Sequence, residues 1–177
     1  MEKITNIEVL LEKLDPNYKD VDQYTDIMSS LALSREHLKE YCKWKDQFYT
    51  RNLVKKTKAY ELIVLCWEPR QGSPVHNHQG QDCWMYVVSG KMIEVQYHCK
   101  KNNDTDSWEV KEGDHISCIS GNTRYINDDI CLHKIVNATD ERAITLHLYS
   151  YPIETCNIYC CQTGKVTARK LSYTETS

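Results

Sequence analysis

The chain has 177 residues, a formal net charge of -3 and a pI near 6.2. This length fits one domain with a substantial core, over residues 1–177. The mildly acidic balance argues against nucleic acid or an anionic membrane as a partner, because both select for basic surfaces. The charged amino terminus lacks the apolar run of a signal peptide, and no later segment offers the ~20 apolar residues that span a bilayer. We therefore expect a soluble, cytoplasmic protein.

Cysteine is abundant in this chain, with nine residues. The odd count, the lack of any CxxC motif and the expected absence of a signal peptide argue against a disulfide framework or a zinc ribbon. We expect most of these thiols to be reduced and to behave as small buried hydrophobes.

Residues 1–44 carry apolar side chains at helical spacing. Helices are expected over 4–14, 21–31 and 34–41, with Asp15-Pro16-Asn17 ending the first and Ser34 capping the third. Their apolar stripes need another surface to pack against. We expect this helical preface to support a sheet rather than to carry chemistry.

From residue 45 to 177 the pattern changes to short β-rich runs separated by turn signals. Strands are expected at 48–54, 60–67, 83–88, 92–97, 108–110, 115–119, 133–136 and 143–149. Turns are expected at Ser89-Gly90, Asn102-Asn103-Asp104, Glu112-Gly113-Asp114 and Ser120-Gly121-Asn122, and 100–107 is expected to be a polar loop. Many short strands at this spacing predict a mainly β sandwich or barrel, with further C-terminal strands.

Two histidines separated by one residue, His76 and His78, follow a loop that contains Pro, Arg, Gln, Gly and Ser. In an extended chain, residues two apart project the same way and can bind one metal ion. The HNH triplet alone also fits two surface histidines or two hydrogen-bonded core histidines. A metal centre needs a third ligand from a distant strand. His133 is the best candidate, because it begins a short strand after the turn-like run 126–129.

The order of these motifs resembles the cupin superfamily. The HxH pair is followed by Gly90, expected to close a hairpin, and later by His133 with Asn137 four residues on. Cupins are double-stranded β-helix barrels of the jelly-roll type, with the metal inside the barrel. The resemblance therefore implies a jelly-roll barrel behind the helical preface.

Cys83 departs from the usual cupin pattern, since most cupins have a carboxylate ligand between HxH and the glycine. Three neutral imidazoles would leave a divalent ion with its full charge and with open positions. Such a site favours an anionic substrate ligand, and a thiolate is a suitable one. Metal coordination would also keep that sulfur deprotonated near neutral pH.

Several separated segments between about residue 41 and residue 165 together resemble the cysteine dioxygenases. They are Tyr49-Thr50-Arg51-Asn52-Leu53, Cys66-Trp67, His76-Asn77-His78 with Cys83, Tyr125-Ile126-Asn127-Asp128 before Leu132-His133, and Leu146-His147-Leu148-Tyr149-Ser150 with Cys156. These enzymes are non-haem iron dioxygenases of cysteine catabolism that convert free L-cysteine to cysteine sulfinic acid. The resemblance implies one Fe²⁺ per chain, with L-cysteine and O₂ as substrates. We expect a monomer.

Position by position, the resemblance implies that His76, His78 and His133 bind the iron. Arg51 corresponds to the arginine that holds the substrate carboxylate, a role that suits a guanidinium able to make two parallel charge-assisted hydrogen bonds. Tyr49 is two residues earlier, expected on the same strand face, and resembles a tyrosine at the same end of the pocket.

Tyr149 and His147 lie two apart on one expected strand, so both can point into a barrel. The resemblance implies a thioether crosslink between Tyr149 and Cys83, with the tyrosine hydroxyl near iron and substrate. It also implies that His147 orients this hydroxyl. Three further residues match outer positions of the site: Trp67 behind His147 and Tyr149, Cys156 near the pocket mouth, and Thr145 where a serine is common.

Three alternatives fit part of the pattern. A thiol dioxygenase for 3-mercaptopropionate or cysteamine would share the ligands but would use Arg51 differently. A non-catalytic metal-binding cupin would need only the three metal ligands. It would not account for the presence of Arg51, His147 and Tyr149 as well. A structural zinc site is disfavoured, because three histidines leave open coordination positions.

Overall fold

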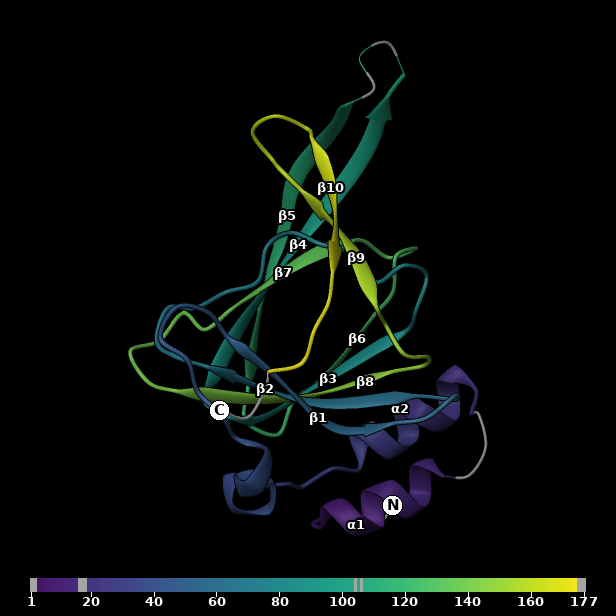
Figure 1. Cartoon of the computed structure of the whole chain (residues 1–177), viewed down its shortest axis with the longest axis vertical. Coiled ribbons are helices and arrows are strands. Elements are labelled where there is room, and N and C mark those ends of the chain that lie inside the picture. Colours follow the sequence, from purple (N-terminus) through teal and green to yellow (C-terminus); the bar gives the residue numbers. More distant parts are fainter. Residues whose placement is uncertain (1–2, 16–18, 104, 106, 175–177) are drawn as a thin grey trace.

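The computed structural model describes residues 3–15, 19–103, 105 and 107–174. Its elements are α1 (Ile7–Leu14), α2 (Val21–Ser29), the 3₁₀ helix η1 (Arg35–Tyr41), β1 (Thr50–Lys56), β2 (Glu61–Trp67), β3 (Cys83–Ser89), β4 (Lys91–Asn102), β5 (Ser107–Ile119), β6 (Thr123–Ile126), β7 (Leu132–Val136), β8 (Ala143–Tyr149), β9 (Thr155–Tyr159) and β10 (Val166–Lys170). The helices gather at one end of the strands (Figure 1). None of the described helices has the length and apolarity needed to cross a bilayer.

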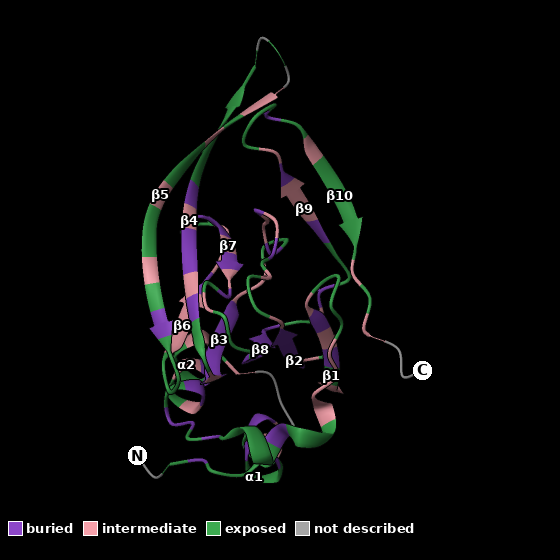
Figure 2. Cartoon of the chain, turned by 90° about the vertical axis from the view of Figure 1, so that its left-hand side faces the viewer, coloured by how far each residue is buried: buried purple, intermediate pink, exposed green. Residues whose placement is uncertain are grey.

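The strands form one five-stranded sheet and two smaller ones. The strand orders are β1-β2-β8-β3-β6, β5-β4-β7 and β10-β9. The strand pairings are antiparallel. In Figure 2 the smaller sheets rise from opposite ends of the larger one. The predicted fold class, a mainly β jelly-roll behind a helical preface, is confirmed.

An extended segment, residues 72–77, joins the two smaller sheets. His76 is bridged to His133 of β7 on one side and to Ile158 of β9 on the other. Tyr159 N–H donates to the Val75 carbonyl at 2.9 Å, which extends the contact with β9. The order β5-β4-β7, segment 72–77, β9-β10 therefore forms one continuous layer.

Gly90 connects the two layers rather than closing a hairpin, so that part of the prediction is wrong. Strand β3 pairs with β6 and β8, whereas β4 pairs with β5 and β7. Gly90 has φ +87°, and a Cβ there would lie 2.8 Å from the Ala143 side chain. Only glycine fits this turn, because it combines a left-handed backbone with a close approach to β8.

Strand β5 is longer than predicted and runs through the expected turn at Glu112-Gly113-Asp114. Val95 pairs with His115 and Tyr97 pairs with Glu112, so Gly113 and Asp114 together face one residue of β4. This arrangement is a β-bulge. Glycine occurs in β-bulges as well as in the turn that was predicted here. The expected polar loop 100–107 is shorter than predicted, because β4 continues to Asn102 and β5 begins at Ser107.

Most other boundaries agree with the sequence pattern to within two residues, and β8 agrees at both ends. Strands β6, β9 and β10 were not individually predicted. The predicted helix end at Asp15-Pro16-Asn17 and the turn at Asn102-Asn103-Asp104 fall partly outside the described residues.

The central strands β2, β8 and β3 are buried on both faces. One face packs against the helices through Leu62, Val64, Cys66, Trp84, Tyr86, Leu146 and Leu148, among others. The opposite face carries Ile63, Leu65, Trp67, Cys83, Met85 and Tyr149, with buried Thr145 and His147 between them. The alternation follows from the two-residue period of a strand. It sends every second residue of β8 to the side on which the histidines lie.

Candidate metal centre

The backbone brings His76 and His133 directly opposite each other. His76 N–H donates to the His133 carbonyl at 3.0 Å, and His133 N–H donates back at 3.2 Å. His78 follows on the same segment, and its N–H donates to Asp128 Oδ1 at 2.6 Å. Asp128 Oδ2 also accepts from Gly80 N–H at 2.8 Å, which fixes the loop after the HxH pair.

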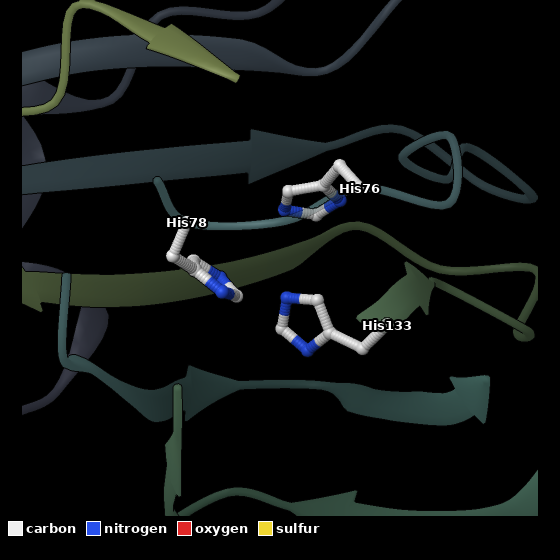
Figure 3. A group of neighbouring side chains, drawn as sticks. All are labelled: His76, His78 and His133. Atoms are coloured by element: carbon white, nitrogen blue, oxygen red, sulfur yellow. The ribbon is translucent and has the colours of Figure 1, made fainter. Parts of the chain in front are cut away.

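The three imidazoles converge on one point (Figure 3). One ligand atom from each of His76, His78 and His133 lies within 4.8 Å of the other two. The ring centroids are 4.7 to 5.2 Å apart, with interplanar angles of 51° to 66°. This spacing and spread allow three nitrogens to share one metal ion.

An oxygen atom lies near the Nδ1 of each ring, and two of the three are within hydrogen-bonding distance. The His76 Nδ1 lies 3.0 Å from the Pro74 carbonyl, and the His133 Nδ1 lies 3.1 Å from Glu94 Oε1. The His78 Nδ1 lies 3.5 Å from Asp128 Oδ1 and makes no hydrogen bond among the described residues. An oxygen at Nδ1 favours the tautomer with the proton there, which leaves Nε2 as the lone-pair donor.

Burial keeps at least two of these rings neutral. Burial, together with the neighbouring histidines, holds the pKa of His76 and of His133 well below the ordinary value. A neutral imidazole is the form that binds a metal, so no proton has to be displaced near neutral pH. Converging lone pairs, oriented rings and lowered pKa values fit a metal ion with three nitrogen ligands.

Arg51 lies beside the histidines and is largely buried, at 12% exposure of its side chain. Its Nη2 is 3.5 Å from Oε1 of Glu61, a fully buried carboxylate. The Arg51 Nε is buried without a hydrogen-bond partner among the described residues. The Glu61 Oε2 accepts from the Ile153 N–H at 2.9 Å. Arg51 therefore has one weak anionic contact and a remaining guanidinium edge that can bind a carboxylate.

Tyr49 precedes strand β1 instead of lying within it, yet it lines the same space as Arg51. Its ring stacks on Trp67, with centroids 4.4 Å apart. The Trp67 indole N–H donates to Thr145 Oγ1 at 2.9 Å, and the same oxygen lies 2.9 Å from His147 Nε2. A continuous contact path thus runs from Tyr49 to His147.

Cys83 and Tyr149 are direct cross-strand partners in the pairing of β3 with β8. Directly opposite residues bring their Cβ atoms to about 5 Å, so the thiol and the phenol ring are neighbours. Burial raises the pKa of the Tyr149 hydroxyl well above its ordinary value; the Cys83 thiol adds to this effect and Arg51 opposes it. Tyr149 is therefore a protonated hydrogen-bond donor at neutral pH.

The histidines open into a cavity of about 480 Å³. Its lining includes Arg51, Tyr49, Tyr149 and the buried Cys156. A smaller inner space of about 20 Å³ adds His133, His147 and Trp67 to the residues already named. Most of the predicted site residues therefore line these two adjoining spaces, Thr145 supports His147 from behind, and Cys83 is not among the lining residues.

Sequence reasoning missed three carboxylates of the site, namely Glu61, Glu94 and Asp128. Glu94 is buried between His133 and Arg124, whose Nε donates to its Oε2 at 3.0 Å. Asp128 belongs to one of the segments that carry the family resemblance, but no role was predicted for it. The sequence signal for Glu61 and Glu94 is a single acidic residue in an apolar run. Such a residue is rarely buried without a partner.

A family model and curated relatives show the family to which this chain is similar. The family described as "Cysteine dioxygenase type I" matches residues 3–162 of this chain. Cysteine dioxygenase type 1 of Homo sapiens is 30% identical over 162 residues, covering 89% of this chain and 78% of the relative. The protein of the same name from Bos taurus is 31% identical over 149 residues, covering 82% and 72%. A solved double-stranded beta-helix protein from Klebsiella pneumoniae has a TM-score of 0.49 at 20% identity, covering 64% and 86%.

Proposed function

The chain belongs to the cysteine dioxygenase type I family, and from this premise we propose that it adds both atoms of O₂ to the thiol of free L-cysteine. The product is cysteine sulfinic acid, so RSH and O₂ combine to RSO₂H without another reactant. The observation that supports this function best is the placement of Arg51 and Tyr149 around three converging imidazoles.

We assign His76, His78 and His133 as ligands of one Fe²⁺ per chain. Bound ferrous iron would supply a redox-active centre with open coordination positions for the thiol and for dioxygen. The three imidazoles are neutral ligands, so they leave the ionic charge for an anionic substrate group. Glu94 holds the His133 ring in place, and Asp128 fixes the backbone of His78.

Arg51 binds the substrate carboxylate through the guanidinium edge that Glu61 leaves open. This contact orients the thiol toward the histidines, so binding energy from a remote group lowers the entropic cost of the reaction. The Tyr149 hydroxyl, which lines the small inner space, donates a hydrogen bond toward the reacting atoms. Leu65 of β2 and Ile135 of β7 add apolar walls to the inner space.

We further propose a thioether between Cys83 and Tyr149. Forming the C–S bond removes one hydrogen from the thiol and one from the phenol ring, and dioxygen accepts both. Their cross-strand pairing supports this proposal. The crosslinked peptide should be lighter than the sum of its two parts by two hydrogens in a mass spectrum, and Cys83→Ser should abolish it.

The decisive experiment measures oxygen uptake by iron-loaded protein with L-cysteine, 3-mercaptopropionate and cysteamine in parallel, together with metal analysis. We expect uptake with L-cysteine and formation of its sulfinic acid. No uptake with any thiol at full iron occupancy would contradict the function and favour a non-catalytic metal-binding protein. Preference for one of the other thiols would redirect the substrate assignment.

Arg51→Ala tests the carboxylate clamp. The KM for L-cysteine should rise about tenfold to a hundredfold, the size of hydrogen bonds to a charged group. The KM for cysteamine, which has no carboxylate, should change little. Arg70→Ala is the matched control, because Arg70 forms an exposed ion pair with Asp140 outside the cavity.

A further inference from the structure

The wall of the cavity carries an unusual charge distribution. Its lining includes four cationic side chains, Lys45, Arg51, Arg169 and Lys170, and no aspartate or glutamate among the described residues. The chain as a whole is slightly acidic, at -3. The positive wall is therefore a local property of this space and not a consequence of overall charge.

Glu61 offsets part of the charge of Arg51. The Arg51 guanidinium lies 3.5 Å from the buried Glu61 carboxylate, behind the lining. This opposite charge weakens the attraction of Arg51 for an incoming anion. The remaining cations of the wall add to the attraction of an anionic substrate.

Arg169 is the cation best placed for this role. It is the direct cross-strand partner of Cys156 in the pairing of β10 with β9. Directly opposite residues project to the same face of a sheet, and Cys156 is a buried residue of the cavity wall. Arg169 therefore faces the cavity from its outer part. No carboxylate of the described chain lies within ion-pair distance of its guanidinium.

The charge of Arg169 affects the pKa values of two nearby groups. Burial raises the pKa of the Cys156 thiol and of the Tyr49 hydroxyl, and the guanidiniums of Arg51 and Arg169 oppose this rise in both cases. The Arg169 charge thus reaches residues of the cavity wall.

The segment that carries Arg169 is held at both ends. Strand β10 pairs with β9 along its whole length, and the Leu171 N–H donates to the Glu154 carbonyl at 2.8 Å. Thr174 exchanges two hydrogen bonds with the backbone of Arg51, at 2.7 and 3.0 Å. This anchoring makes the segment a fixed wall of the cavity.

We propose that Arg169, in a cavity that Lys45 and Lys170 also line, forms an anion-binding subsite at the cavity mouth that captures the carboxylate of a small thiol acid before Arg51 binds it. The subsite makes Arg169 a specificity-determining residue that favours thiols with a carboxylate over thiols without one. The identity of the thiol rests on the proposed function, but the anion preference of the cavity does not.

The first test uses alkylation of Cys156 and needs no enzyme activity. The purified full-length chain is treated with iodoacetate, an anion, or iodoacetamide, its neutral counterpart, and the adduct at each cysteine is measured by mass spectrometry. In both reactions the thiolate displaces iodide. We expect a higher ratio of iodoacetate to iodoacetamide modification at Cys156 than at the exposed Cys161, which serves as internal reference. Arg169→Gln should lower the Cys156 ratio to the reference value.

The second test measures steady-state oxygen uptake at low and high salt. Arg169→Gln should raise the KM for L-cysteine about threefold to fivefold, the size of a solvent-exposed ion pair, with a much smaller change in kcat. It should also weaken the salt dependence of kcat/KM, whereas the values for cysteamine should stay unchanged. Lys165→Gln is the matched control, because it removes the same charge from the exposed loop before β10, outside the cavity.

The two tests separate the possible failures. Equal alkylation ratios at Cys156 and Cys161, or equal effects of Arg169→Gln and Lys165→Gln on KM and salt dependence, would overturn the subsite. Absence of oxygen uptake would contradict the proposed function but would leave the alkylation result as the test of the subsite.

Discussion

The two faces of the central strands have different roles, although alternate residues of the same strands form both faces. On the helix side, β8 presents Ile144, Leu146 and Leu148 to an apolar core. On the other side it presents His147 and Tyr149 to the cavity, with Thr145 bonded to His147. The helix side gains its stability from burial of apolar surface. The cavity side buries polar groups, which is tolerable only because most of them have partners.

This contrast separates stability from chemistry within one sheet. A change on the helix side should alter the free energy of unfolding and leave the site intact. A change on the cavity side should alter metal binding, substrate binding or pH dependence. The following four experiments test this separation, beginning with the largest expected effect.

His133→Ala should reduce oxygen uptake to background and prevent stoichiometric iron binding, because two imidazoles from one segment cannot replace three converging ligands. Iron content by metal analysis and oxygen uptake with L-cysteine are the measurements. His115→Ala is the control, since His115 is exposed and contacts only the exposed Glu112 among the contacts described. Full iron occupancy in His133→Ala would remove His133 from the ligand set.

Leu146→Ala should lower the free energy of unfolding by about 2 to 5 kcal/mol, because it leaves a cavity in the core beneath the helices. Urea denaturation gives this value, and the KM for L-cysteine should stay the same. Leu53→Ala, at a more exposed position of β1, should cost far less. A large KM change in the Leu146 variant would show that the two faces are coupled.

Glu94→Gln should weaken iron binding about tenfold to a hundredfold, because a neutral amide no longer holds the His133 Nδ1 proton with a full charge. Competition with a chelator measures the affinity. Glu109→Gln provides the control, as Glu109 is exposed and pairs only with Lys111 among the ion pairs described. Equal affinities in the two variants would contradict a supporting role for Glu94.

Acidification should destabilise the cavity side through His147. Burial, followed by the Arg51 charge, holds the pKa of His147 well below the ordinary value. Below about pH 6.5 the unfolded chain therefore binds a proton that the folded chain does not, so stability is lost as the pH falls. The free energy of unfolding should therefore fall as the pH is lowered from 7 to 5. Urea denaturation of metal-free His147→Gln should show a smaller pH slope than the natural chain, and a slope equal to it would exclude this contribution.

The sequence pattern predicts much of the fold because the strands alternate or run apolar without interruption. Strand β8 was predicted at both ends, since turn residues flank a wholly buried run. Gly90 and Gly113 were both misassigned, because a hairpin turn, a change of sheet and a β-bulge can all contain glycine. Only the pairing of the strands distinguishes these cases.

By itself the sequence determined the family. It also predicted the three histidines as metal ligands and Arg51 as the carboxylate-binding residue, because these residues lie in recognisable motifs with fixed spacing. The tertiary structure alone decided that Glu94 supports His133, that Glu61 offsets Arg51 and that Arg169 lies across from Cys156. A charged residue in a strand has no defined partner until the register is set, since a shift of one residue turns its side chain to the opposite face.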